Sequence, residues 1–282
     1  MDDLDYEKHV ENYKRLYGYY GDNPNIDKTR TLKDAEEEAK YHHALSVFNP
    51  LRDWIEKAVE IAGGLNNPNA RYYMLHGAGR RFGITFRAYQ KITGRAYNKR
   101  SEPLSSDEQI DLSLAINITY MNIPGILDNF AWCLLYERQP DLANKISQNH
   151  VGLFSKEFRK QLDAFSEIAE EIEVHDSWQK EIKERRDPVA HRIPLYVPPS
   201  LLTQEEANIY SAINSRYTNS LNGLQLDEAG TALEQMDSIG TFYPSFIHHP
   251  EEPHIPIYPT IPTDMSHLIR IGDAVSNCLR GR

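Results

Sequence analysis

Apolar residues recur at every third or fourth position over much of this 282-residue chain, and this spacing constrains its fold most. It places apolar side chains on one face of an α-helix, whereas a half-buried strand would show strict alternation. The clearest stripe consists of Ala44, Phe48, Leu51, Ile55, Ala58 and Ala62. Pro50 lies inside it, so we expect a kink or a break near Asn49. Gly63 and Gly64 predict the end of this helix.

The same spacing predicts further helices. Residues 70–93 form a helical run whose glycines (Gly77, Gly79 and Gly83) allow close packing. Ser105 or Ser106, followed by two acidic residues, predicts the start of a third helix, because a hydroxyl caps free amides and acids suit the helix dipole. A long helix is expected over residues 158–186.

Towards the C-terminus, Thr203 and Glu206 form a capping box that begins another helix, and a terminal helix is expected over residues 264–279. Prolines make residues 193–200 extended, and six more prolines between residues 244 and 262 indicate a second loop. No repeat and no convincing run of alternating strands is found.

We therefore predict an all-α fold, a helical bundle of long amphipathic helices with proline-rich loops and a helical C-terminal extension. The predicted division is an N-terminal helical segment (1–29), the bundle (30–200) and the extension (201–282).

The chain carries a net charge of −10, which argues against a protein that coats nucleic acid without specificity. Residues 71–100 are an exception, because they hold eight basic residues and no acidic one, with aromatic residues interleaved. Charge and stacking together can hold a single strand of nucleic acid. We predict RNA contacts at Arg80, Arg81 and Arg87. The alternative is a solvated basic face above core aromatics.

The composition predicts a cytoplasmic protein. The acidic N-terminus lacks the features of a secretory signal. Residues 115–136 are apolar and long enough to cross a membrane, but they contain too many polar residues to face lipid. Cys133 and Cys278 lie far apart among apolar residues, which favours reduced, buried thiols.

The most informative segment is Arg186 to His191, with Asp187 directly after the arginine and Pro188 next. Arginine offers planar donors that match phosphate oxygens, and histidine can exchange a proton near neutral pH. Together they suffice to cleave RNA without a metal. Arg71 and His76 show the same spacing, so the spacing alone is weak evidence. The structural alternative is that Arg186 caps its helix and His191 bonds a backbone carbonyl.

Arg186, Asp187 and His191 resemble the motif of the HEPN superfamily (higher eukaryotes and prokaryotes nucleotide-binding domains). That motif is an arginine, usually a polar residue, three to five further residues, and a histidine. The resemblance covers the helical core, residues 30–200, and only the motif is specific. The sequence departs from some toxin members of the family two positions after the histidine, because they have a tyrosine where this chain has Ile193. The last 80 or so residues also have no counterpart in the minimal domain.

The resemblance implies an all-α homodimer in which two Arg/His pairs share a cleft, without cofactor, metal or membrane. Many members are metal-independent ribonucleases of toxin–antitoxin, abortive-infection and CRISPR-linked defence systems. It implies RNA as substrate, an antitoxin protein as a further partner, and products with a 2′,3′-cyclic phosphate. His191 would be the general base or acid, Arg186 would clamp the scissile phosphate, and Asp187 would orient one of them.

Asp128 and Asn129 are polar residues inside an otherwise apolar predicted helix. Without partners, burying them would cost about 1–3 kcal/mol each. We predict that they orient Arg186 or His191. The alternatives are a satisfied polar pair in the core and a helix start at Asp128.

Two other functional classes stay open from the sequence. One is a non-catalytic helical module that binds a nucleotide or a protein. The other is a small-molecule enzyme or cofactor binder that uses the Asp128 helix and the loop from His248 to His254. The histidine spacing in that loop matches no recognised metal motif, so we predict no metal.

Overall fold

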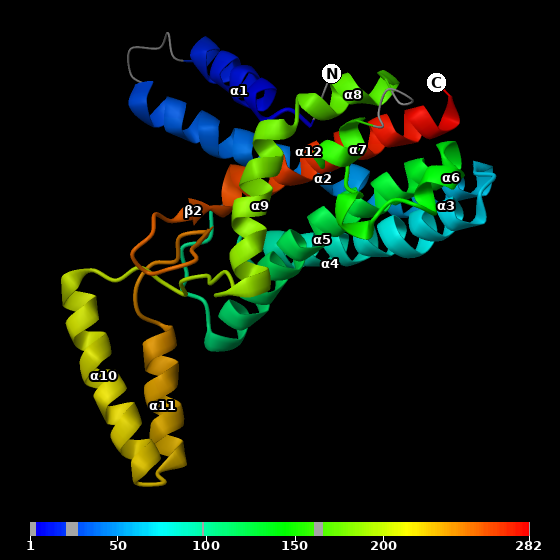
Figure 1. Cartoon of the computed structure of the whole chain (residues 1–282). Helices are drawn as coiled ribbons and strands as arrows, with labels where there is room; N and C mark the ends of the chain where they lie inside the picture. The colour runs from blue at the N-terminus through cyan, green and yellow to red at the C-terminus, as the bar shows by residue number, and fades with distance from the viewer. Residues whose placement is uncertain (1–3, 21–27, 98, 161–165, 282) are drawn as a thin grey trace.

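The structure is a computed structural model that describes residues 4–20, 28–97, 99–160 and 166–281. It confirms the all-α prediction, since helices dominate and the described strands form one small antiparallel sheet (Figure 1). In chain order the elements are α1 (Tyr6–Tyr20), α2 (Lys28–Gly64), α3 (Pro68–Tyr72), η1 (Tyr73–Gly79), α4 (Arg80–Arg95), α5 (Ser106–Arg138), α6 (Pro140–Ala143), η2 (Gln148–His150), α7 (Lys156–Lys160), α8 (Ser166–Glu173), α9 (Asp176–His191), α10 (Gln204–Asn222), α11 (Leu226–Asp237), β1 (Ser245–Phe246), β2 (Ile255–Pro256) and α12 (Ile257–Arg280).

The core lies where α2, α4, α5 and α12 pack together. Trp54 of α2 stacks on Phe82 of α4, with ring centres 4.9 Å apart, and its ring centre is 5.5 Å from that of Phe130 in α5. Such aromatic pairs contribute about 1 kcal/mol each beyond the area they bury. On the other side α12 approaches so closely that a Cβ on Gly272 would lie 2.5 Å from the indole ring. One aromatic residue therefore joins four helices.

The helix α2 runs unbroken through Pro50, where the sequence predicted a kink or a break. A proline inside a helix removes one hydrogen bond and costs about 3 kcal/mol. Val47, Leu51 and Trp54 flank the proline and are buried in the core. Burial of each such side chain contributes roughly 1.5–3 kcal/mol, so their packing outweighs the cost and keeps the helix continuous.

The helix α5 begins where predicted, because Ser105 and Glu108 form a capping box. Among the described residues it is the one helix long and apolar enough to cross a membrane, and 50% of its apolar window is buried inside the protein. That burial is typical of a core helix.

The helix predicted over residues 70–93 passes from α3 through a π-helical turn, η1, into α4. A Cβ on Gly77 would overlap the side-chain oxygen of Asn129, and one on Gly79 would lie 3.1 Å from Ala58. These two glycines therefore permit close packing on α5 and α2. Gly83 does not serve this purpose, because its nearest neighbour would be 3.9 Å away.

The single long helix predicted over residues 158–186 is wrong, because α8 and α9 are separate helices. The chain turns at Val174 and His175, where the His175 side chain is buried against Trp178. Residues 161–165 of the predicted helix lie outside the described residues. The predicted end was also wrong, since α9 continues through Pro188 to His191. Apolar spacing could not reveal a turn that leaves the same face buried.

The C-terminal region is not a single extension. Its last helix, α12, packs against α2 and supplies residues to the main core, so a boundary at residue 200 divides one core. In contrast, α10 and α11 form a hairpin that extends away from the bundle (Figure 1). The predicted capping box of Thr203 and Glu206 begins α10. At the base of the hairpin Leu201 pairs with Thr241.

Candidate functional site

The Arg186–His191 segment forms the last turns of α9. The Arg186 guanidinium pairs with its neighbour Asp187, with 3.2 Å between Nη1 and Oδ1. Both side chains are partly exposed, and His191 is exposed. Because successive helical residues are ~100° apart, Arg186 and His191 point ~140° apart and do not converge within one chain. Asp187 and His191, four residues apart, share a face of the helix.

A cavity of about 480 Å³ lies between α5, α9 and the loop around η2, and we call it the Arg186 cavity. Its lining includes Arg186, Asp187 and Asp128. The structure therefore places Asp128 close to the arginine. Asp128 is exposed at the surface, yet enough protein surrounds its carboxyl to raise the pKa, and the charges of Arg186 and Arg81 partly oppose this rise.

Arg81 reaches this region from α4. Its Nη1 donates a hydrogen bond of 3.1 Å to Oδ1 of Asn122, a buried residue of α5. The guanidinium lies against Gly125, where a Cβ would come within 2.5 Å of its central carbon. Gly125 thus leaves the space that Arg81 occupies, so this glycine and Asn122 are supporting residues that the sequence interpretation missed.

Asn129 does not line the Arg186 cavity. Its amide donates to the carbonyl of Gly125, and its side chain packs against Gly77 of η1. The two predicted residues therefore differ in their contacts. Asp128 lines the cavity, whereas Asn129 bonds within α5 and packs against η1.

The predicted RNA-binding arginines are divided as well. Arg80 and Arg87 are exposed and line a different cavity, about 570 Å³ in volume, between α4 and α5. Its lining is largely apolar and includes Ile84 and Leu114. Only Arg81 lies beside Asp128.

Much of the remaining basic run is neutralised by acidic residues elsewhere in the chain. Arg95 and Arg100 pair with Glu108, Lys91 pairs with Asp111, and Lys99 pairs with Glu38. These pairs leave less positive charge for a nucleic acid than the sequence count suggests.

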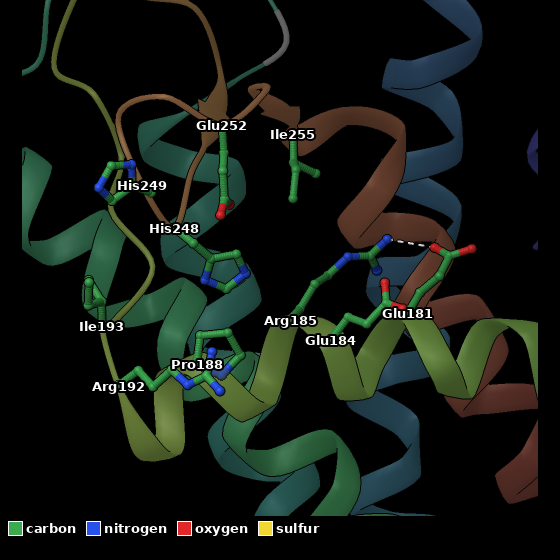
Figure 2. Close-up of a pocket in the computed structure, with 10 residues that line it drawn as sticks. All are labelled: Glu181, Glu184, Arg185, Pro188, Arg192, Ile193, His248, His249, Glu252 and Ile255. Atoms are coloured by element: carbon green, nitrogen blue, oxygen red, sulfur yellow. Dashed lines mark hydrogen bonds and ion pairs between the residues drawn. The ribbon is translucent and has the colours of Figure 1, made fainter.

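A cavity of about 660 Å³ lies on another face of α9, opposite the loop before α12, and we call it the His248 cavity (Figure 2). Its lining consists of Glu181, Glu184, Arg185, Pro188, Arg192, Ile193, His248, His249, Glu252 and Ile255. Arg192 directly follows His191, so this cavity adjoins the end of the motif helix.

Arg185 is held in place by Asp264, a buried carboxylate of α12. Its Nη1 donates to both Asp264 oxygens at 3.0 and 2.9 Å, and Tyr120 and Trp178 each donate to Asp264 at 2.9 Å. Burial raises the pKa of Asp264 to about 6, although Arg185 opposes this rise. The sequence interpretation missed this cluster. An acid within the apolar stripe of the terminal helix was the available signal.

The His248 ring lies between Glu252 and Pro188 (Figure 2). Its Nδ1 is buried and has no hydrogen-bond partner among the described residues. Burial lowers the pKa of this imidazole, Glu252 raises it, and Arg185 lowers it. The ring is therefore mostly neutral at pH 7.

The other histidines of this loop do not join His248 in a metal site. His254 contacts the Ser245 hydroxyl, with 2.9 Å between Nδ1 and Oγ. In the part of the chain that the structure describes, no group of three or more His, Cys, Asp or Glu side chains is arranged to hold a metal ion.

Comparisons with family models, with curated proteins and with solved structures found no match to this chain.

Proposed function

We propose that this protein is a metal-independent endoribonuclease that acts as a homodimer. The observation that carries the proposal is that Arg186 shares one cavity with Asp187 and Asp128, beside Arg81 and on the same helix end as His191. Two guanidinium groups, Arg186 paired with a carboxylate and Arg81 held by the amide oxygen of Asn122, fit a phosphate that carries developing charge.

In the proposed reaction, neutral His191 accepts the proton of an RNA 2′-hydroxyl group. The 2′-oxygen forms a bond to phosphorus while the bond from phosphorus to the 5′-oxygen breaks. The imidazolium returns its proton to the departing 5′-oxygen, which leaves a 2′,3′-cyclic phosphate and a 5′-hydroxyl. Arg186 stabilises the charge on the non-bridging oxygens, and its ion pair with Asp187 fixes the guanidinium.

The cellular context belongs to the same proposal. The proposal includes a cytoplasmic location for the enzyme. The resemblance to HEPN toxins extends the proposal to a toxin–antitoxin or phage-defence system, with an antitoxin protein as partner.

The test is cleavage of a panel of single-stranded RNAs by the wild type and by His191→Ala, with and without EDTA. We expect the substitution to lower the cleavage rate by about 100-fold or more, as is usual when a general acid or base is removed. The matched control is His76→Ala, because His76 is also exposed and follows an arginine by five positions. Its rate should equal that of the wild type.

Equal losses in both variants would contradict a specific role for His191. If the folded wild type cuts no RNA of the panel, the non-catalytic binding module is the better account. Cleavage by the wild type that disappears with EDTA would refute the metal-free mechanism.

A further inference from the structure

The His248 cavity has the size and position of a substrate pocket. Its volume of about 660 Å³ falls within the range of small-molecule sites, roughly 300–1,000 Å³. It adjoins Arg192, the residue after the proposed catalytic histidine. An RNA bound at the end of α9 would therefore have one nucleotide within reach of this cavity.

The cavity walls suit a base rather than a phosphate. Pro188, Ile193 and Ile255 provide apolar surface for a flat ring. The carboxylates of Glu181, Glu184 and Glu252 are hydrogen-bond acceptors that repel phosphate. Arg185 cannot compensate, because Asp264 and Glu181 already engage its guanidinium.

Among the four bases, guanine best matches the polar groups that line the cavity. Guanine offers two adjacent donors, N1–H and the N2 amino group, which match the two oxygens of one carboxylate. Its O6 and N7 are acceptors that suit an arginine. Adenine, cytosine and uracil each present an acceptor where guanine has one of its paired donors. In Figure 2 Glu252 approaches the cavity from the loop and Arg192 from the end of α9.

We propose that the His248 cavity binds a guanine base of the RNA next to the scissile phosphate. Glu252 accepts hydrogen bonds from the donor edge, and Arg192 donates to the acceptor edge. The location of the guanine beside the cleaved bond rests on the proposed ribonuclease function, whereas guanine binding itself does not.

The test is calorimetric titration of the full chain with GMP, AMP, CMP and UMP in EDTA. We expect GMP to bind at least tenfold more tightly than the other three nucleotides, and Glu252→Gln to remove this preference. The matched control is Glu251→Gln, because Glu251 is an exposed carboxylate on the same loop and does not line the cavity. Thermal unfolding of both variants verifies that they are folded.

Equal binding of the four nucleotides would overturn the proposal, and so would equal effects of the two substitutions. Displacement of GMP by inorganic phosphate alone would show that the site binds the phosphate group rather than the base, and this result would also overturn the proposal. GMP should bind His191→Ala as it binds the wild type. Selective GMP binding without RNA cleavage would refute the ribonuclease and leave the guanine site standing. RNA cleavage without selective GMP binding would refute the guanine site and leave the ribonuclease standing.

Discussion

At the scale of single residues, burial of polar groups links the helices to one another. His43 of α2 is fully buried, and its Nε2 lies 3.1 Å from the hydroxyl oxygen of Ser266 in α12. Burial lowers the pKa of His43 to about 4, with a further contribution from His9. The histidine is therefore neutral in the folded protein at pH 7, and protonation opposes folding.

This burial predicts a loss of stability in mild acid. Because the unfolded chain binds the proton more tightly, the contribution of His43 is complete above about pH 6.5 and is lost as the pH falls towards 4. Between pH 7 and pH 5 the free energy of unfolding should drop by about 2 kcal/mol on account of this residue. Urea unfolding at both pH values should show a smaller drop for His43→Gln. His42→Gln, at the exposed neighbouring residue, is the control, and equal drops in the wild type and His43→Gln would refute the prediction.

The candidate site was predictable only where its residues are close in sequence or carry a motif. Asp187 follows Arg186 directly, and the polar character of Asp128 inside an apolar helix was visible in the sequence. The cluster around Asp264 was not predictable as a cluster. Its members come from α5, α9 and α12, and only the packing of those helices brings them together.

At the scale of the helices, apolar spacing predicted α2 and the helical run that contains α4, and the capping signal at Ser105 predicted the start of α5. It failed where a proline or a turn is decided by tertiary packing. Pro50 and Pro188 both lie inside helices, and the turn before α9 has no glycine or proline to mark it. Local propensity is a weak guide where neighbouring helices supply the larger free energy.

The approach of α12 to α2 depends on the absence of a side chain at Gly272. Alanine there would place its Cβ 2.5 Å from the Trp54 ring, which is packed on Phe82 and cannot easily yield. We expect Gly272→Ala to lower the free energy of unfolding by about 1–3 kcal/mol, measured by urea unfolding.

Gly230 of α11 provides the matched control, since a Cβ there would meet nothing within 4 Å. Alanine at this open helical position should raise stability by roughly 0.5–1 kcal/mol. A Gly272→Ala protein as stable as the wild type would show that the two helices separate without cost, contrary to the packing described.

At the scale of the whole molecule, the arrangement of the two cavities bears on how a site is completed. The Arg186 cavity and the His248 cavity lie on different faces of α9, and His191 is the last residue of that helix. In one chain Arg186 and His191 point ~140° apart. A phosphate held by Arg186 therefore needs a histidine from another direction, which a second copy of the chain supplies if the two α9 ends face each other.

This geometry predicts that two inactive variants restore activity when combined. A dimer of one Arg186→Ala chain and one His191→Ala chain has one site with both residues intact and one with neither, if each site takes its arginine and histidine from different chains. After mixing under conditions that exchange subunits, about half of the dimers should be mixed, so the RNA cleavage rate should reach roughly a quarter of the wild-type rate.

Light scattering must show dimers in every sample. Native mass spectrometry verifies the exchange, because the mixed dimer differs in mass from both parent dimers. If the mixed variants stay inactive although exchange is complete, both residues act from the same chain, and the helix end must rearrange when RNA binds.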